Sequence, residues 1–161
     1  MLLFDRRTFL LSAVALAGCG FQPTYGPNGS GSALHGAIRV DTSGNREAYV
    51  LANKLEDIFA RPATPTYALT FDVDTDEAAV GITPEQEITR YHVTGKAKYS
   101  LVNIADGQTV ASGEVNSFTA YSATGSTVSS VTATRDAYDR LMEILADQMA
   151  AQIHAKVAVP R

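Results

Sequence analysis

Residues 88–103 read ITRYHVTGKAKYSLVN, and residues 109–121 read TVASGEVNSFTAY. In both stretches apolar and polar side chains alternate, which predicts two antiparallel strands with one buried face. Between them, Ala105-Asp106-Gly107 predicts a three-residue hairpin loop with a left-handed glycine. If Ile104 faces Gln108, then Tyr99 faces Gly113, where an aromatic ring can cover a strand glycine. The same register places Leu101 opposite Ala111 and Ala97 opposite Val115.

The rest of the chain predicts a layer of helices on a layer of strands. Apolar residues recur at helical spacing in Asn45–Ala60, where Thr42 or Ser43 can cap the start, and again in Thr134–Lys156. Strands are expected at Ala37–Val40 and from Tyr67 to about Asp76, and the Ser/Thr-rich segment Ser117–Thr134 is expected to fray into a loop. The order strand, helix, three strands, helix predicts an α+β domain.

The N-terminus has the pattern of a bacterial lipoprotein signal. Arg6 and Arg7 precede the apolar run Phe9–Ala17, which is too short to span a bilayer. Leu16-Ala17-Gly18-Cys19 then resembles a lipobox, in which the cysteine is acylated and the chain is cut before it. We therefore expect a signal peptide at residues 1–18, a lipidated tether at 19–33 and one domain at 34–161. The two arginines leave twin-arginine and general export both open.

Composition narrows the possible functions of the mature chain. Without the signal peptide, 143 residues remain, with 11 basic and 16 acidic side chains and a net charge of −5. An acidic body argues against nucleic-acid binding, because phosphates require a basic face. The three histidines, His35, His92 and His154, are too far apart in the sequence for a metal motif, and no serine-hydrolase elbow or phosphate loop occurs. We expect no enzyme activity, no cofactor and no metal.

Two stretches resemble a known family. Residues 19–26 read CGFQPTYG, and the final helix contains Arg135-Asp136-Ala137-Tyr138. Together with the order of elements, these stretches resemble the LptE family of lipopolysaccharide-assembly lipoproteins. The resemblance implies two helices packed on one face of a four-stranded, mostly antiparallel sheet. It further implies an outer-membrane location, an LptD-like β-barrel partner and contact with lipopolysaccharide at one tip.

Six residues are candidates for contact with this ligand or partner. Arg90, Lys96 and Lys98 share one face of the strand 88–103 with His92, and they form a basic row opposite the core face. Charge-assisted contacts from such residues suit phosphates. The other candidates lie towards the last helix and its preceding loop: Phe118, Tyr121 and Arg135.

The basic row has a second interpretation, which is pairing with acidic side chains on neighbouring strands. A turn near Ile82 would place Asp74 opposite Arg90 and Asp72 opposite His92, and the downstream hairpin places Glu114 beside Lys98. Only Lys96, opposite Asn116, would then have no acidic neighbour. The segment Glu77–Glu87, where the family implies a basic contact, contains no Lys or Arg.

The sequence therefore predicts a lipid-anchored binding protein of the outer membrane that supports lipopolysaccharide assembly through a β-barrel partner. An adaptor or pilotin lipoprotein of another transport system is the alternative. A tethered hydrolase is a third, which would need a Ser, a His and a carboxylate brought together by the fold.

Overall fold

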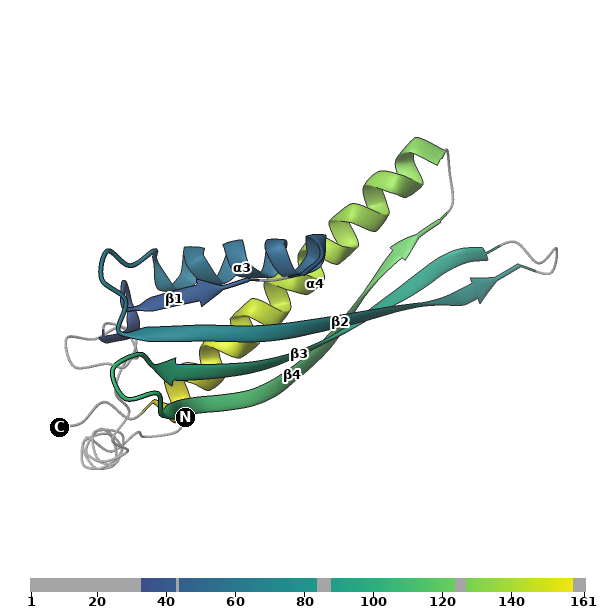
Figure 1. Cartoon of the computed structure of the whole chain (residues 1–161). Coiled ribbons are helices and arrows are strands. Elements are labelled where there is room, and N and C mark those ends of the chain that lie inside the picture. Colours follow the sequence, from purple (N-terminus) through teal and green to yellow (C-terminus); the bar gives the residue numbers. More distant parts are fainter. Residues whose placement is uncertain (1–32, 43, 84–87, 124–126, 158–161) are drawn as a thin grey trace, which may run out of the picture.

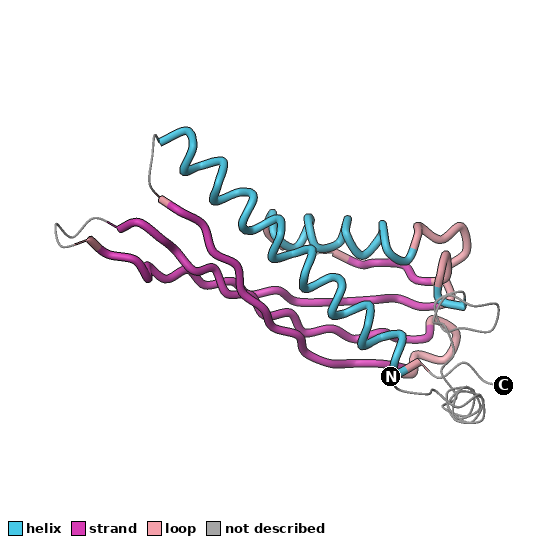
Figure 2. Tube along the Cα trace, turned by 180° about the vertical axis from the view of Figure 1, so that it is seen from behind, coloured by secondary structure: helices cyan, strands magenta, loops and turns pink. Residues whose placement is uncertain are grey.

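A four-stranded mixed sheet carries two helices on one face (Figure 1). The computed structural model describes residues 33–42, 44–83, 88–123 and 127–157. The sheet order is β1-β2-β3-β4, and only β1 and β2 pair in parallel. Figure 2 shows both helices on the same side of the strands, which confirms the predicted α+β class. The elements are β1 (Ile38–Asp41), α3 (Arg46–Phe59), β2 (Tyr67–Ile82), β3 (Ile88–Asn103), β4 (Thr109–Ser122) and α4 (Thr127–Lys156).

Helix α3 lies where its apolar spacing predicts. It buries Ala48, Leu51, Ala52, Leu55 and Phe59 against the sheet and α4. The predicted cap was wrong, because the Asn45 side chain accepts a hydrogen bond from the Ala48 backbone N–H at 2.9 Å. An asparagine oxygen at this position satisfies one of the unpaired N–H groups at the helix start.

Helix α4 begins earlier than the sequence predicts. The segment Ser117–Thr134 is not a frayed loop: β4 continues to Ser122, and α4 starts at Thr127. Serine and threonine are only modest helix formers, so the sequence gives this extension little support. Further along, α4 buries its predicted apolar stripe in the common core: Ala137, Leu141, Leu145, Met149 and Ile153 are fully buried, and Ile144 is half-buried. Met142, which is not part of that stripe, is fully buried as well.

The β3–β4 register is confirmed where the core needs it. Tyr99 lies opposite Gly113, Leu101 opposite Ala111 and Ala97 opposite Val115. Gly107 has the expected left-handed backbone, with φ of 71°. The pairing at the turn itself differs, because Asn103 N–H donates to the Gln108 carbonyl and Ile104 belongs to the turn. A register shift between Leu101 and Val102 absorbs the extra residue.

The predicted β2–β3 register is wrong. Asp74 lies opposite Lys96 rather than Arg90, and Asp72 lies opposite Lys98 rather than His92. The strands run on to Ile82 and restart at Ile88, so the connection between them lies further along the chain than the predicted turn. The slip is by an even number of residues, so each side chain keeps its face while its partner changes.

The domain is elongated, with two different ends. At one end, the base, Gly36 N–H donates to the Phe59 carbonyl at 2.6 Å, and Ile104 N–H donates to the Thr66 carbonyl. At the other end, the tip, lie the last residues of β2, the start of β3 and the first turns of α4 (Figure 1). The 16 residues of β2 span about 50 Å, whereas the 14 residues of α3 reach only about 20 Å and end before the tip half of β2.

Within the described ranges, neither helix has the length and apolar character needed to cross a membrane. The lipobox, Cys19 and nearly all of the expected tether lie outside the described residues.

Candidate functional site

The fold separates the six candidate residues onto two surfaces. Arg90, Lys96, Lys98 and Phe118 point away from the helices, on the outer face of the sheet. Tyr121 lies on the face that α4 covers, and Arg135 lies on α4 itself. The structure therefore does not bring the six together into one site.

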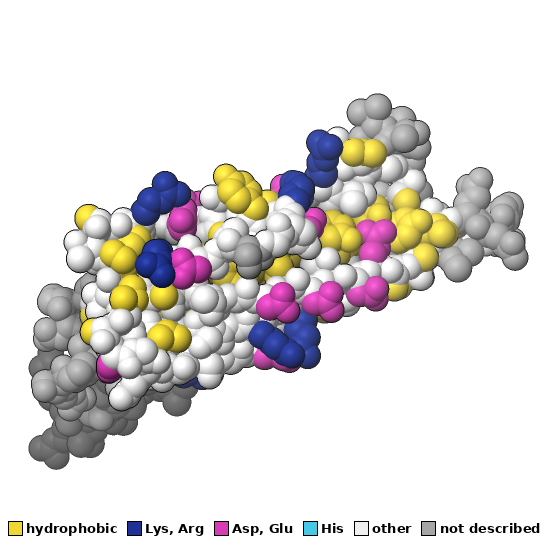
Figure 3. Space-filling model, in the orientation of Figure 1, with side chains coloured by type: hydrophobic (Ala, Val, Ile, Leu, Met, Phe, Trp, Pro, Cys, Tyr) yellow, Lys and Arg dark blue, Asp and Glu magenta, His cyan; other side chains and the backbone are white. Residues whose placement is uncertain are grey.

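The basic row on the outer face lies between acidic strands. Lys98 sits between Asp72 of β2 and Glu114 of β4, and Lys96 sits between Asp74 and Asn116. Lys96 Nζ forms an ion pair with Glu114 Oε1 at 2.9 Å, diagonally across the strands. Figure 3 shows acidic side chains in a row beside this basic cluster. Lys96 therefore has acidic neighbours on both sides, contrary to the prediction that it alone would lack one.

Arg90 is the one Arg or Lys of the basic row that has no acidic cross-strand neighbour among the described residues. It lies near the tip, opposite Gly81 on β2 and Ser122 on β4. Its side chain is exposed, and it forms no ion pair with the residues that the structure describes. The corrected register thus moves the uncompensated cation from Lys96 to Arg90.

Phe118 forms part of a shallow groove on the outer face. The groove has a volume of about 770 Å³, and its wall includes Phe118, His92, Lys96 and Asp76. Phe118 is 64% exposed, and its ring lies 5.7 Å from that of His92. Phe118 therefore presents an exposed aromatic ring beside charged side chains of the outer face.

Tyr121 belongs to a polar cluster beneath α4. Its hydroxyl donates to Glu77 Oε1 at 3.1 Å, and the Tyr138 hydroxyl donates to Glu77 Oε2 at 3.4 Å. Tyr121 also stacks on Tyr91, with 5.2 Å between ring centres. Glu77 thereby links β2 to β4 and to α4.

The environment of this cluster disfavours ionised tyrosines. Burial raises the pKa of Tyr121, a hydrogen bond with Thr134 lowers it, and the Glu77 carboxylate raises it again. Burial also raises the pKa of Tyr138, and the negative charge of Glu77 adds to the effect. Both hydroxyls therefore remain donors at neutral pH. Glu77 is not part of a loop before β3, where the family resemblance implied a contact: it is a strand residue on the helix-facing side of β2. Extending the alternation of β2 beyond Asp76 would have indicated this.

Arg135 lines a small cleft where α4 passes the start of α3. The cleft has a volume of about 300 Å³, with Arg46, Glu47 and Tyr138 in its wall. Arg46 is engaged, since its guanidinium donates to Asp139 at 3.0 Å. Arg135 is exposed and forms no ion pair within the described part of the chain. In the same described part, no cluster of His, Cys, Asp and Glu could hold a metal ion.

Comparison with known proteins assigns the fold and the family. The model of the LptE family, described as lipopolysaccharide-assembly, matches residues 36–153. The chain belongs to the LptE family. The matched region includes all four strands, α3, most of α4 and the six candidate residues, whereas Cys19 lies before it.

Solved structures share this LptE fold at low sequence identity. A lipoprotein from Caulobacter crescentus is 20% identical with a TM-score of 0.66, and the alignment covers 78% of this chain and 93% of that one. Rare lipoprotein B from Shewanella oneidensis is 6% identical with a TM-score of 0.56, covering 74% and 92%. A minor lipoprotein from Acinetobacter baumannii is 13% identical with a TM-score of 0.52, covering 77% and 95%. No curated protein matches the chain in sequence.

Proposed function

We propose that this LptE-family chain is an outer-membrane lipoprotein that binds an LptD-like β-barrel and supports delivery of lipopolysaccharide to the cell surface. Cys19 carries the lipid anchor, and the described domain is the binding body. The proposal assigns the chain no covalent chemistry. Its contribution is to hold a partner in place and to present a surface to lipopolysaccharide.

The elongated shape supports separate roles for the lipid anchor and for the binding domain. The described chain begins at Ala33, 14 residues after Cys19, and its first residues are bound to the base through Phe59. An anchor on this segment keeps the base near the membrane and leaves the tip about 50 Å further along the strands. Anchoring also raises the effective concentration of the domain beside a membrane partner, so that a modest interface can hold a lasting complex.

The chemistry of the tip is the observation that carries the proposal. Three apolar side chains on three different elements are exposed there, Val80 on β2, Ile88 on β3 and Val131 on α4. In the same half of the molecule, Arg90 and Arg135 have no acidic partner among the described residues. A surface that offers apolar side chains and unpaired arginines suits an amphipathic ligand with acyl chains and phosphates.

Affinity purification tests the partner. The tagged, lipidated chain is purified from detergent-solubilised outer membranes, and the proteins recovered with it are identified by mass spectrometry. A large β-barrel recovered in a fixed ratio is the expected result. Recovery of a different transport or secretion component, or of the chain alone, would contradict the proposal. The matched control is Cys19→Ser, which removes the anchor and leaves the described domain unchanged.

A further inference from the structure

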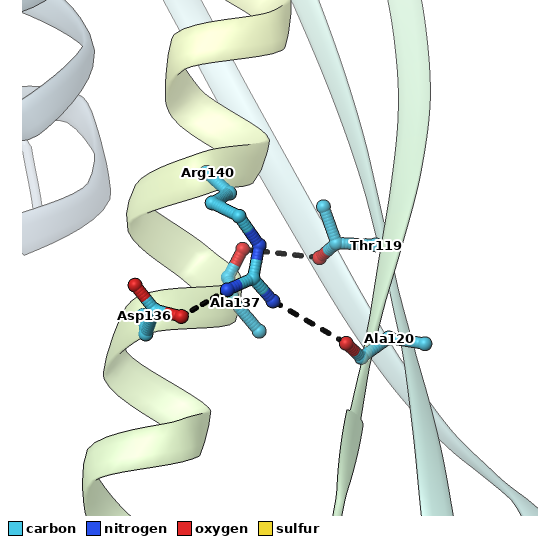
Figure 4. Close-up of polar contacts among 5 residues, drawn as sticks. All are labelled: Thr119, Ala120, Asp136, Ala137 and Arg140. Atoms are coloured by element: carbon cyan, nitrogen blue, oxygen red, sulfur yellow. Dashed lines mark hydrogen bonds and ion pairs between the residues drawn. The ribbon is translucent and has the colours of Figure 1, made fainter.

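The two edges of the sheet differ in how their backbone groups are covered. On β4, three carbonyls along the outer edge accept hydrogen bonds from α4 side chains. Lys156 donates to the Ser112 carbonyl, Gln152 donates to that of Glu114 at 3.3 Å, and Arg140 donates to that of Ala120 at 3.4 Å. Figure 4 shows Arg140, which is also paired with Asp136, reaching the Ala120 carbonyl. These contacts occupy the groups that an added strand would need.

Within the part of the chain that the structure describes, the opposite edge is open over most of its length. β1 has four residues and pairs only with Tyr67–Thr70 of β2, although β2 has 16 residues. From Asp72 to Ala79, a stretch we call the open edge, β2 pairs with β3 on one side only. No hydrogen bond from another described element reaches its other side. The open edge contains no proline and no bulge, so its backbone has the regular geometry that strand addition requires.

The charge along the open edge is negative. Asp72, Asp74 and Asp76 alternate along the outer face of β2, all exposed, and none forms an ion pair within the described residues. The nearby Lys96 directs its ammonium to Glu114 rather than to Asp74. This part of the outer face therefore has four acidic side chains, including Glu114, against two lysines.

We propose that the open edge binds an extended basic segment of another protein, which adds a strand beside β2. Lys or Arg at every second position of that segment would lie next to Asp72, Asp74 and Asp76. The alternate positions would face inwards beside the half-buried Val73 and Thr75, where small or β-branched side chains fit. Backbone hydrogen bonds would supply affinity, and the aspartates would select the partner by charge.

The same charges argue against two other occupants. A second copy that paired edge to edge would place one row of aspartates against another, which is destabilising. The chain's own segment 20–32 has no Lys or Arg and contains Pro23 and Pro27, so it offers neither the charge nor a continuous set of donors. This inference goes beyond the proposed function, because it requires neither a β-barrel nor lipopolysaccharide.

Peptide binding to the full lipidated chain in detergent tests the inference. The probe is a fluorescent eight-residue peptide with alternating Lys and Thr, matched in length to the open edge; the comparison peptides have Glu in place of Lys, or carry N-methyl groups on alternate amides. The Lys peptide should bind, and the Glu peptide should not. N-methylation should abolish binding, because it removes the donors that pair with β2. If the N-methylated peptide bound as tightly as the unmethylated Lys peptide, the contact would be non-specific charge attraction, and the proposal would be wrong. Absence of binding by the Lys peptide would also overturn it.

Matched variants locate the bound peptide. Asp74→Asn/Asp76→Asn should weaken binding by about tenfold or more at low salt, because it removes two neighbouring charges. Asp57→Asn/Asp147→Asn removes the same charge from exposed helix positions and should leave affinity unchanged. Bound peptide should slow amide hydrogen exchange in Asp72–Ala79. Slowed exchange in β4 instead, or equal weakening by both variants, would contradict the open-edge assignment.

Discussion

Leu141 of α4 packs directly onto the backbone of Gly95 in β3. A Cβ atom at residue 95 would lie 2.9 Å from Leu141 Cδ2 and 3.2 Å from Leu145 Cδ1. Both leucines are fully buried, so neither side chain can move aside into solvent. The missing side chain at Gly95 thus sets how closely α4 approaches the middle of the sheet.

Gly95→Ala should therefore destabilise the domain. Overpacking a filled core typically costs about 1–3 kcal/mol, and urea unfolding of the purified chain measures the change. Gly113→Ala is the matched control, because a Cβ there meets the ends of the Gln152, Lys156 and Tyr99 side chains. Its effect should be smaller than that of Gly95→Ala, since the flexible ends of Gln152 and Lys156 can shift. Equal losses for both variants would show that α4 is not held at Gly95.

Glu77→Gln should lower the pKa of Tyr121 and Tyr138. Burial raises both pKa values above the ordinary value of 10.0, and the Glu77 carboxylate, which accepts both hydroxyl hydrogen bonds, raises them further. A raised folded pKa means that this stabilisation is complete below about pH 10 and is lost as the pH rises through the folded pKa. Absorbance titration of tyrosinate measures the shift.

Glu47→Gln provides the comparison for Glu77. Glu47 acts on Tyr138 only through its charge and makes no hydrogen bond to either tyrosine among the described contacts. The tyrosine pKa should shift more in Glu77→Gln than in Glu47→Gln. Amide hydrogen exchange in the first turns of α4 should also be faster in Glu77→Gln, because Tyr138 loses its hydrogen bond to β2. An unchanged titration in Glu77→Gln would rule out the shared carboxylate.

The sequence determined some registers and not others, for local reasons. Asp106-Gly107 strongly favours a tight turn, so the register of β3 against β4 could be predicted from the turn position. The one-residue register shift near the turn could not be predicted in this way. The β2–β3 connection has no comparable signal, and the residues before it form an irregular pairing near Gly81. An even slip left each side chain on its predicted face, but it placed Asp74 opposite Lys96 and left Arg90 opposite Gly81. The face of a candidate residue was thus predictable, whereas its electrostatic environment was not.

His154 should make the domain less stable in weak acid. It lies against Phe59 in the base, with 5.5 Å between ring centres, and burial lowers its pKa below the ordinary value of 6.5. The unfolded chain therefore binds the proton more readily than the folded chain. The free energy of unfolding should be constant above about pH 6.5 as far as this group is concerned, and it should fall as the pH drops towards the lower folded pKa. His154→Phe, which keeps a ring, should remove this part of the fall; an unchanged pH profile would contradict the assignment to His154.

Charge reversal should separate the two groups of candidate cations. Lys96→Glu places a third negative charge beside Glu114 and Asp74, so it should cost about 0.2–1 kcal/mol of stability through like-charge repulsion across the strands. Arg90→Glu/Arg135→Glu breaks no ion pair among the described residues and should change stability by less than about 0.5 kcal/mol.

Ligand binding should follow the opposite order. If the tip holds the phosphates of lipopolysaccharide, Arg90→Glu/Arg135→Glu should weaken binding of purified lipopolysaccharide by about tenfold or more, because two cations become two anions. Lys96→Glu should weaken binding less, since the Lys96 ammonium already forms an ion pair with Glu114. Equilibrium binding of lipopolysaccharide to the tagged chain, measured beside urea unfolding, checks both expectations. If Lys96→Glu weakened binding more than the double variant at equal stability, the ligand contact would lie around Lys96 in the middle of the sheet and not at the tip.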